Sequence, residues 1–237
     1  MSESCPKILK LMDLFHVLNR GVEKRTIFLD DRDRFRFIHN LFEFNDQNRV
    51  EARNIFNKSA KTNFSDIGCQ KVRRPRKLLV DIHAFCLMPS HYHLLLSERV
   101  EHGIPLFMKK INMGYAKYFN ERNQRTGALF QGRYRSVAVK REAHFIYLPY
   151  YIHLNPLDME APTWREGKIN NPEKTIKFLE NYRWSSYLDY VGKKNFPSVT
   201  NRSFLSKVLS GADNYKKETM DWVRKMDYSI FQEVALE

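Results

Sequence analysis

Two β-rich runs joined by a proline-containing turn are the feature that most constrains how this chain folds. Leu78–Leu87 and His91–Glu98 are dominated by branched and aromatic side chains, and Met88-Pro89-Ser90 separates them. The pattern predicts an antiparallel hairpin whose second strand begins at His91. Because side chains alternate along a strand, His91 and His93 are expected on one face, where two imidazoles can bind one metal ion.

The other predicted elements place this hairpin inside a larger sheet. In chain order they are a strand at Leu11–Leu18 that ends at the turn signal Asn19-Arg20-Gly21, a helix at Asp30–Asn45, the hairpin, an amphipathic helix at Ile104–Arg122, a strand at Gly132–Lys140 and a helix at Glu142–Asn155. Strand, helix, strand, strand, helix, strand is the order of the ferredoxin-like α+β fold. We therefore expect a βαββαβ core with an antiparallel sheet and an extra helix behind its fourth strand.

The chain of 237 residues is long enough for one packed domain with additions. We expect a core at 8–160 with a basic insertion at about 46–78, in which Val50–Phe56 could prolong the preceding helix. Residues 161–237 are expected to form a C-terminal appendage of loop and helix packed on the core. Within it, a loop is expected as far as Pro172, and helical patterns occur at Ser203–Leu209 and Ala212–Lys225.

The charge balance favours a polyanionic partner. The 40 Lys and Arg residues outnumber the 27 Asp and Glu residues and give a net charge of +13, which favours nucleic acid. Residues 71–77 are strongly basic, as expected of a phosphate contact but also of a solvated loop. The residues expected to contact nucleic acid are Arg20, Lys71, Arg73, Arg74, Arg76, Lys77, Arg133 and Arg135.

Composition also bears on where such a protein works. The hydrophobic share of 43% supplies a core, yet no run approaches the roughly 18 apolar residues that a membrane span needs. Met1–Lys10 lacks the apolar segment of a secretory signal. Cys5, Cys69 and Cys86 are too widely spaced for a disulfide framework or a CxxC metal site. A cytoplasmic protein without membrane contact is expected.

A second chemical pattern lies in the predicted helix at Glu142–Asn155. Tyr151 and Asn155 are four residues apart and share one helical face, whereas Tyr150 lies about 100° further round. A phenol attacks a phosphodiester if its proton is removed and the phosphate charge is neutralised, and a divalent ion can neutralise that charge. Imidazoles with an amide oxygen suit Mg²⁺ or Mn²⁺. Taken singly, these residues also fit ordinary strand histidines, a core tyrosine and a helix-ending amide.

Five motifs, in this order, resemble the signatures of single-tyrosine HUH transposases, and most of all the REP-associated tyrosine transposases. They are Phe15–Gly21, Met88–Leu95, Gly127–Tyr134, Tyr151–Pro156 and Trp184–Tyr187, and the resemblance extends from about Leu11 to Tyr190. Two positions depart from the family pattern. Ser90 stands where many relatives have Asn, and Pro149 lies two residues before Tyr151, where it is expected to kink the helix.

The resemblance implies a metal-dependent enzyme that nicks and rejoins single-stranded or hairpin DNA without ATP. By position, His91 and His93 match the family's metal-binding pair, Tyr151 its nucleophile, and Asn155 the polar residue that completes the metal site. The tyrosine would form a 5′-phosphotyrosine link and leave a free 3′-OH. The wider family includes dimers with shared active sites, whereas the REP-associated branch looks able to act as a monomer, so a monomer and a homodimer both stay open.

Other functions also stay open. A ferredoxin-like sheet can bind single strands without catalysis by stacking bases on aromatic rings, for which Tyr92, Phe119 and Tyr134 are candidates. A domesticated relative and a replication initiator with the same HUH chemistry are further alternatives, and the transposase-like motifs outside the active site disfavour the initiator. The combination of His91 and His93 with a tyrosine and an amide favours an enzyme, because a stacking surface needs no metal.

Overall fold

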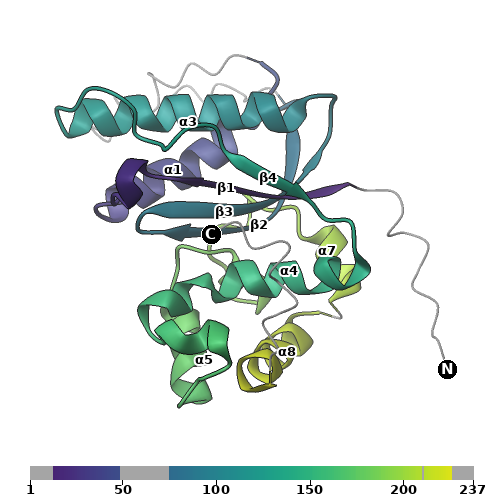
Figure 1. The fold of residues 1–237 in the computed structure, drawn as a ribbon. Coiled ribbons are helices and arrows are strands. Elements are labelled where there is room, and N and C mark those ends of the chain that lie inside the picture. The colour runs from purple at the N-terminus through teal and green to yellow at the C-terminus, as the bar shows by residue number, and fades with distance from the viewer. Residues whose placement is uncertain (1–12, 49–74, 210, 226–237) are drawn as a thin grey trace, which may run out of the picture.

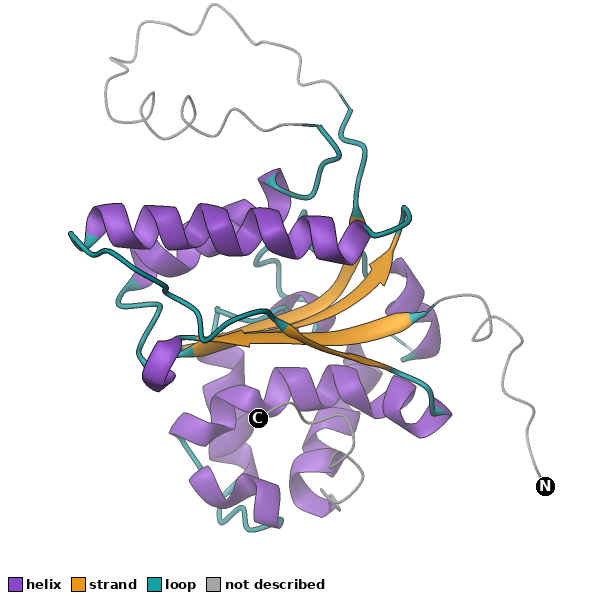
Figure 2. Cartoon of the chain, turned by 45° about the horizontal axis from the view of Figure 1, so that its top comes forward, coloured by secondary structure: helices purple, strands orange, loops and turns teal. Residues whose placement is uncertain are grey.

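This computed structural model describes residues 13–48, 75–209 and 211–225. They form a four-stranded antiparallel sheet in the order β2-β3-β1-β4, with helices against both faces (Figures 1 and 2). The strands are β1 (Leu14–Arg20), β2 (Val80–Met88), β3 (His91–Glu98) and β4 (Arg135–Ala138). The α-helices are α1 (Asp31–Glu43), α3 (Gly103–Arg122), α4 (Glu142–Leu154), α5 (Pro172–Asn181), α6 (Tyr187–Tyr190), α7 (Ser203–Val208) and α8 (Ala212–Lys225), and the 3₁₀ helices are η2 (Val22–Lys24), η3 (Asn155–Met159) and η4 (Pro162–Glu166).

The ferredoxin-like α+β order expected from the sequence is confirmed, and the bounds of β1 and β4 are corrected. The prediction ends the first strand at Leu18, but Asn19 and Arg20 continue β1 because they pair with β3. β4 is shorter than predicted, since only Arg135–Ala138 pairs with β1. The insertion at 46–78, with Val50–Phe56 inside it, lies mostly outside the described residues. The division of the chain at 160/161 stays a prediction.

The two faces of the sheet pack against different helices (Figure 1). One face carries Val17, Tyr92 and Leu94 and forms a hydrophobic core with α1 and α3. The other carries Leu14 and Leu95 and forms a second core with α4, α5 and α8. Because His93 precedes Leu95 by two residues, it faces this second core. Tyr92 and Phe119, two of the rings considered for base stacking, are buried in the first core, so they are not accessible to bases.

The chain beyond Pro156 is more regular than predicted. The expected loop contains η3 and η4, and the unpredicted helix α5 follows at once. Asn171 begins α5 as its N-cap, because its side-chain oxygen accepts a hydrogen bond from the backbone N–H of Lys174 at 2.8 Å, and Pro172 occupies the first turn. α7 and α8 occupy the two segments with helical patterns. Among the described residues, no helix is both long and apolar enough to cross a membrane.

The Trp184-Ser185-Ser186 segment covers the outer edge of β2. The backbone N–H of Leu87 donates to the Trp184 carbonyl at 2.9 Å, and that of Ser186 donates to the Phe85 carbonyl at 3.0 Å. The side-chain oxygen of Ser186 also accepts from the backbone N–H of Phe85 at 2.9 Å. An exposed strand edge can pair with another chain, so covering it protects the sheet. This motif therefore joins the C-terminal segment to the sheet.

His153 fixes α4 between this segment and α8. Its Nε2 lies 2.7 Å from the side-chain oxygen of Ser186, and its Nδ1 lies 2.6 Å from the hydroxyl of Tyr215. The imidazole is fully buried, and burial lowers its pKa to about 3. Since His153 lies two positions from both Tyr151 and Asn155, it points away from their helical face. It is thus an anchor of α4 rather than part of the same face.

Because the pKa of His153 is low in the folded protein, we predict that acid begins to destabilise the fold at a pH well above the range in which carboxylates titrate. An unfolded His153 takes up a proton near pH 6.5, whereas the folded one does so near pH 3. Stability from this group is therefore complete above pH 6.5 and falls by roughly 1.4 kcal/mol per pH unit as the pH drops below it. Urea unfolding at pH 7, 6 and 5 measures the slope, which should be smaller in His153→Gln. An equal slope in that variant would contradict the prediction.

Candidate active site

His91 and His93 lie side by side on the sheet face covered by α4. They are opposite Arg20 and Leu18 of β1, respectively, and their ring centroids are 5.1 Å apart. Both side chains are buried. Strand alternation thus puts the two imidazoles together on one face, as a shared metal ion would require.

A third imidazole, that of His16 on β1, supports this pair. Its Nε2 lies 3.0 Å from Nδ1 of His93, and the two rings stack with centroids 5.2 Å apart. Nδ1 of His91 lies 3.1 Å from the side-chain oxygen of Ser90. Histidines that bind metals commonly have such a partner on the second ring nitrogen, which fixes the tautomer and the ring orientation. His16 was not among the site residues predicted from the sequence, although it lies in the first of the five motifs.

α4 brings Tyr151 to two of these imidazoles, those of His16 and His93. The phenol ring lies with its centroid 6.0 Å from that of His16 and 6.1 Å from that of His93, edge to face in both cases. α4 continues as one helix across Pro149. Asn155 follows at its C-terminal end, where its side-chain N–H donates to the Tyr151 carbonyl at 2.8 Å. Tyr151 and Asn155 are therefore held together under the histidine face of the sheet.

Tyr150, the neighbouring tyrosine, faces a different part of the molecule. Its ring stacks on Tyr215 with a centroid distance of 4.5 Å, and its hydroxyl donates to Glu218 of α8. Burial, followed by this carboxylate, raises the pKa of Tyr150 far above its usual value. A phenol that is both remote from the histidines and hard to ionise is a poor nucleophile.

Arg165 of η4 completes the cluster and was missed in the sequence. It donates to the hydroxyl of Tyr151 at 2.8 Å and to the side-chain oxygen of Asn155 at 2.9 Å. The sequence predicts a loop for its segment, and a loop has no helical or strand spacing that would connect Arg165 to Tyr151. The only sequence signal was a basic residue shortly after the Tyr151–Pro156 motif.

The metal-ligating side chains that lie together here are the imidazoles of His91 and His93, with His16 beside His93. Within the described part of the chain, no three His, Cys, Asp or Glu side chains form a metal-binding group, and the amide oxygen of Asn155 accepts a hydrogen bond from Arg165. Burial above all, and then the neighbouring His16, Arg165 and Arg20, holds the pKa of His93 well below its usual value. Its imidazole is therefore neutral at physiological pH, which is the form that binds metals.

The basic residues predicted to contact nucleic acid fall into two groups. Arg20, Arg133 and Arg135 line a hollow of about 350 Å³ beside the histidines, together with Leu18, Asn19, Gln131 and Gly132. By contrast, Arg76 packs its guanidinium 3.6 Å from the ring centroid of Phe42 and donates to the Phe42 carbonyl, which ties it to the end of α1. Lys77 is exposed, and Lys71, Arg73 and Arg74 lie outside the described residues.

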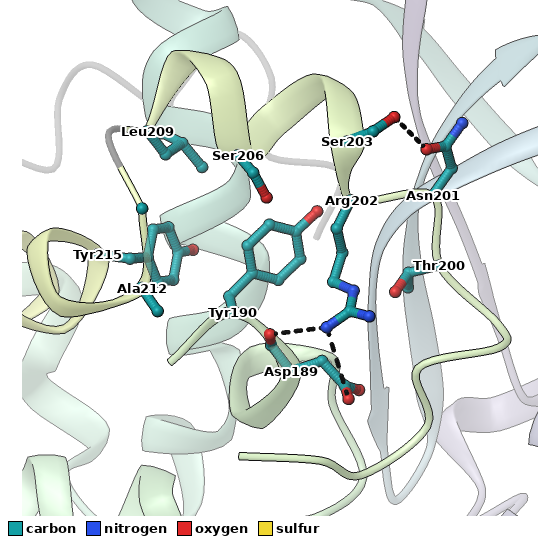
Figure 3. A pocket seen from close by; sticks show the side chains of 11 residues that line it. Asp189, Tyr190, Thr200, Asn201, Arg202, Ser203, Ser206, Leu209, Ala212 and Tyr215 are labelled. Carbon is teal, nitrogen blue, oxygen red and sulfur yellow. Dashed lines mark hydrogen bonds and ion pairs between the residues drawn. The ribbon is translucent and has the colours of Figure 1, made fainter. Parts of the chain in front are cut away.

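A separate hollow of about 360 Å³ lies between α6, α7 and α8 (Figure 3). Arg202 spans it and donates to the carbonyl of Asp189 at 3.0 Å, while Tyr190 donates to the His83 carbonyl at 2.7 Å. None of the residues predicted to act in catalysis or DNA binding lines this hollow. Its polar groups hold the C-terminal helices on the sheet.

Comparison with known proteins gives a match to one family model and matches among solved structures. Residues 38–155 match the family described as "Transposase IS200 like", a range that includes His91, His93, Tyr151 and Asn155. A search of curated proteins found no match. Among solved structures, "Structure of the REP associates tyrosine transposase bound to a REP hairpin" is similar over 86% of this chain and 96% of that one, with 14% identity and a TM-score of 0.41. This likeness is too distant to transfer residue roles.

Proposed function

We propose a function for this chain from the premise that it belongs to the family of IS200-like transposases, the single-tyrosine HUH transposases. It acts on single-stranded or hairpin DNA, cutting one strand through Tyr151 and rejoining it without ATP. The observation that supports this most directly is that the Tyr151 ring centroid lies about 6 Å from those of His16 and His93, and that His93 in turn lies next to His91.

In the proposed reaction, the phenol oxygen of Tyr151 attacks the phosphorus of a phosphodiester. The phenol proton passes to solvent, and the oxygen's electron pair forms the new O–P bond. The bond from phosphorus to the 3′ oxygen breaks, and that oxygen keeps the bonding pair and takes a proton from solvent. The product is a 5′-phosphotyrosine with a free 3′-OH, and attack by a 3′-OH reverses the reaction.

His91, His93 and Asn155 would hold Mg²⁺ or Mn²⁺ in this proposal. The ion would neutralise charge on the phosphate. His16 and Ser90 orient the two imidazoles through their Nδ1 atoms, and His153 sets the rotation of α4. The chain itself thus supplies the nucleophile, the ligands and the framework that aligns them.

The deciding experiment is the isolation of a covalent protein–DNA adduct. Protein, Mn²⁺ and a labelled single strand copied from the DNA that flanks the gene should give a species that survives denaturing electrophoresis. Peptide mapping should place the nucleotide on Tyr151. A protein that binds this strand but never forms the adduct would instead be the non-catalytic DNA-binding protein.

The hollow beside the histidines predicts where the DNA backbone runs. Arg133 and Arg135 are exposed there, so replacing both with Gln should weaken binding. The slope of log affinity against log salt should fall by roughly 0.7 for each phosphate of a single strand that the variant no longer neutralises. Fluorescence anisotropy at several salt concentrations measures this slope. Lys117→Gln on α3 is the matched control, since Lys117 is exposed and pairs only weakly with Glu121 at 3.7 Å. An unchanged slope in the double variant would place the DNA elsewhere.

A further inference from the structure

Arg165 holds both functional groups of α4 with one guanidinium. Its Nη1 donates to the Tyr151 hydroxyl at 2.8 Å, and its Nη2 donates to the Asn155 side-chain oxygen at 2.9 Å. The first of these acceptors is the atom that attacks phosphorus in the proposed function. The second is the oxygen proposed to bind the metal ion. The rigid guanidinium of Arg165 therefore fixes the position of the Tyr151 hydroxyl relative to the Asn155 side-chain oxygen.

The guanidinium is itself fixed before any DNA arrives. Nε and Nη2 donate to the carboxylate of Asp158 at 3.2 and 3.0 Å. The fully buried ring of Trp164 supports the guanidinium at 4.7 Å, and the indole N–H of Trp164 donates to the same carboxylate. The side chain of Arg165 is still 28% exposed, so a ligand can reach it. Such a preorganised and accessible cation is suited to stabilise charge that develops during a reaction.

We infer that Arg165 is a catalytic residue that directs the phenol oxygen of Tyr151 and stabilises the phosphate during attack. The inference rests on the proposed function of Tyr151. Because one of the two electron pairs of the phenol oxygen accepts an N–H of Nη1, the other pair has a defined direction for attack. Nη1 carries two hydrogens, so it can donate to the phenol and to a phosphate oxygen together.

The geometry also explains why arginine is needed rather than lysine. Only a planar fork can donate to a phenol, an amide oxygen and both oxygens of a carboxylate in fixed directions. If the role of Arg165 were only to pair with Asp158, the contacts to Tyr151 and Asn155 would be unnecessary. Its removal should therefore affect the rate of the chemical step more than DNA affinity.

The test compares Arg165→Ala and Arg165→Lys with the full-length wild type on the labelled flanking strand. At saturating DNA and Mn²⁺, single-turnover adduct formation should slow by about 10²–10³ in Arg165→Ala, the effect of removing one preorganised donor. DNA affinity should change by less than about threefold. Arg165→Lys should restore little, because it lacks the fork. Added guanidinium ion should partly restore Arg165→Ala and should do nothing for Tyr151→Phe.

Arg224→Ala is the matched control, because Arg224 makes an exposed ion pair with Glu173 and touches no part of the site. An Arg165→Ala rate within about threefold of wild type would overturn the inference alone. The inference would also be overturned if Arg165→Ala and Arg165→Lys both slowed adduct formation only in proportion to a loss of folded protein. In that case added guanidinium would not raise the rate. A wild-type protein that forms no adduct through Tyr151 would overturn the proposed function and this inference with it.

Discussion

Tyr151→Phe should abolish the covalent protein–DNA adduct while leaving the fold and the DNA affinity close to those of the wild type. The substitution keeps the aromatic ring beside His16 and His93 and removes only the oxygen. Without that oxygen no O–P bond can form, so the expected loss is complete. The fold loses one hydrogen bond to Arg165, worth about 2 kcal/mol for a charged donor. Circular dichroism would check that the fold is kept, fluorescence anisotropy would check the DNA affinity, and thermal unfolding would measure the cost in stability.

Tyr150→Phe is the matched control for this prediction. The two tyrosines are adjacent in α4, both are buried, and each hydroxyl makes a side-chain hydrogen bond, with Glu218 for Tyr150 and Arg165 for Tyr151. The control should therefore show a similar cost in stability but keep the adduct. An adduct that persists in Tyr151→Phe and disappears in Tyr150→Phe would identify Tyr150 as the nucleophile and would require α4 to rotate beyond Pro149.

The parts of the site that depend on local spacing could be predicted from the sequence. His91 and His93 share a face because they are two apart on one strand, and Tyr151 and Asn155 share a face because they are four apart at the end of one helix. The same logic predicted the order of strands and helices. In each case the relevant geometry is contained within a few consecutive residues.

The parts that depend on distant pairing could not be predicted in this way. His16 meets His93 only because β1 and β3 pair in a register that aligns Leu18 with His93, and no periodicity within β1 specifies that register. Arg165 reaches Tyr151 because η3 and η4 turn the chain back under α4, in a segment without a clear period. The role of Trp184-Ser185-Ser186 likewise appears only once the edge of β2 is located.

The second large effect concerns the metal ion. His93→Gln should lower Mn²⁺ affinity by at least about 100-fold and reduce adduct formation accordingly, because a buried neutral imidazole is replaced by a weaker amide ligand. His91→Gln should behave in the same way. His16→Gln should lower Mn²⁺ affinity less, by about 10–100-fold, because His16 only orients the His93 ring through a hydrogen bond to Nδ1 of His93. Electron paramagnetic resonance of free Mn²⁺ measures affinity without DNA and without turnover.

The graded order of these losses separates a metal site from a merely structural cluster of histidines. If His16, His91 and His93 served only to pack β1 against β3, all three variants would lose stability and none would change Mn²⁺ binding in the protein that remains folded. His102→Asn is the control, because His102 is an exposed histidine at the start of α3 with a positive φ of 57°, a conformation that Asn tolerates. Equal Mn²⁺ affinity in wild type, His93→Gln and His102→Asn would exclude the metal from this face of the sheet. Arg165 and the surrounding arginines would then have to neutralise all of the phosphate charge in the reaction at Tyr151.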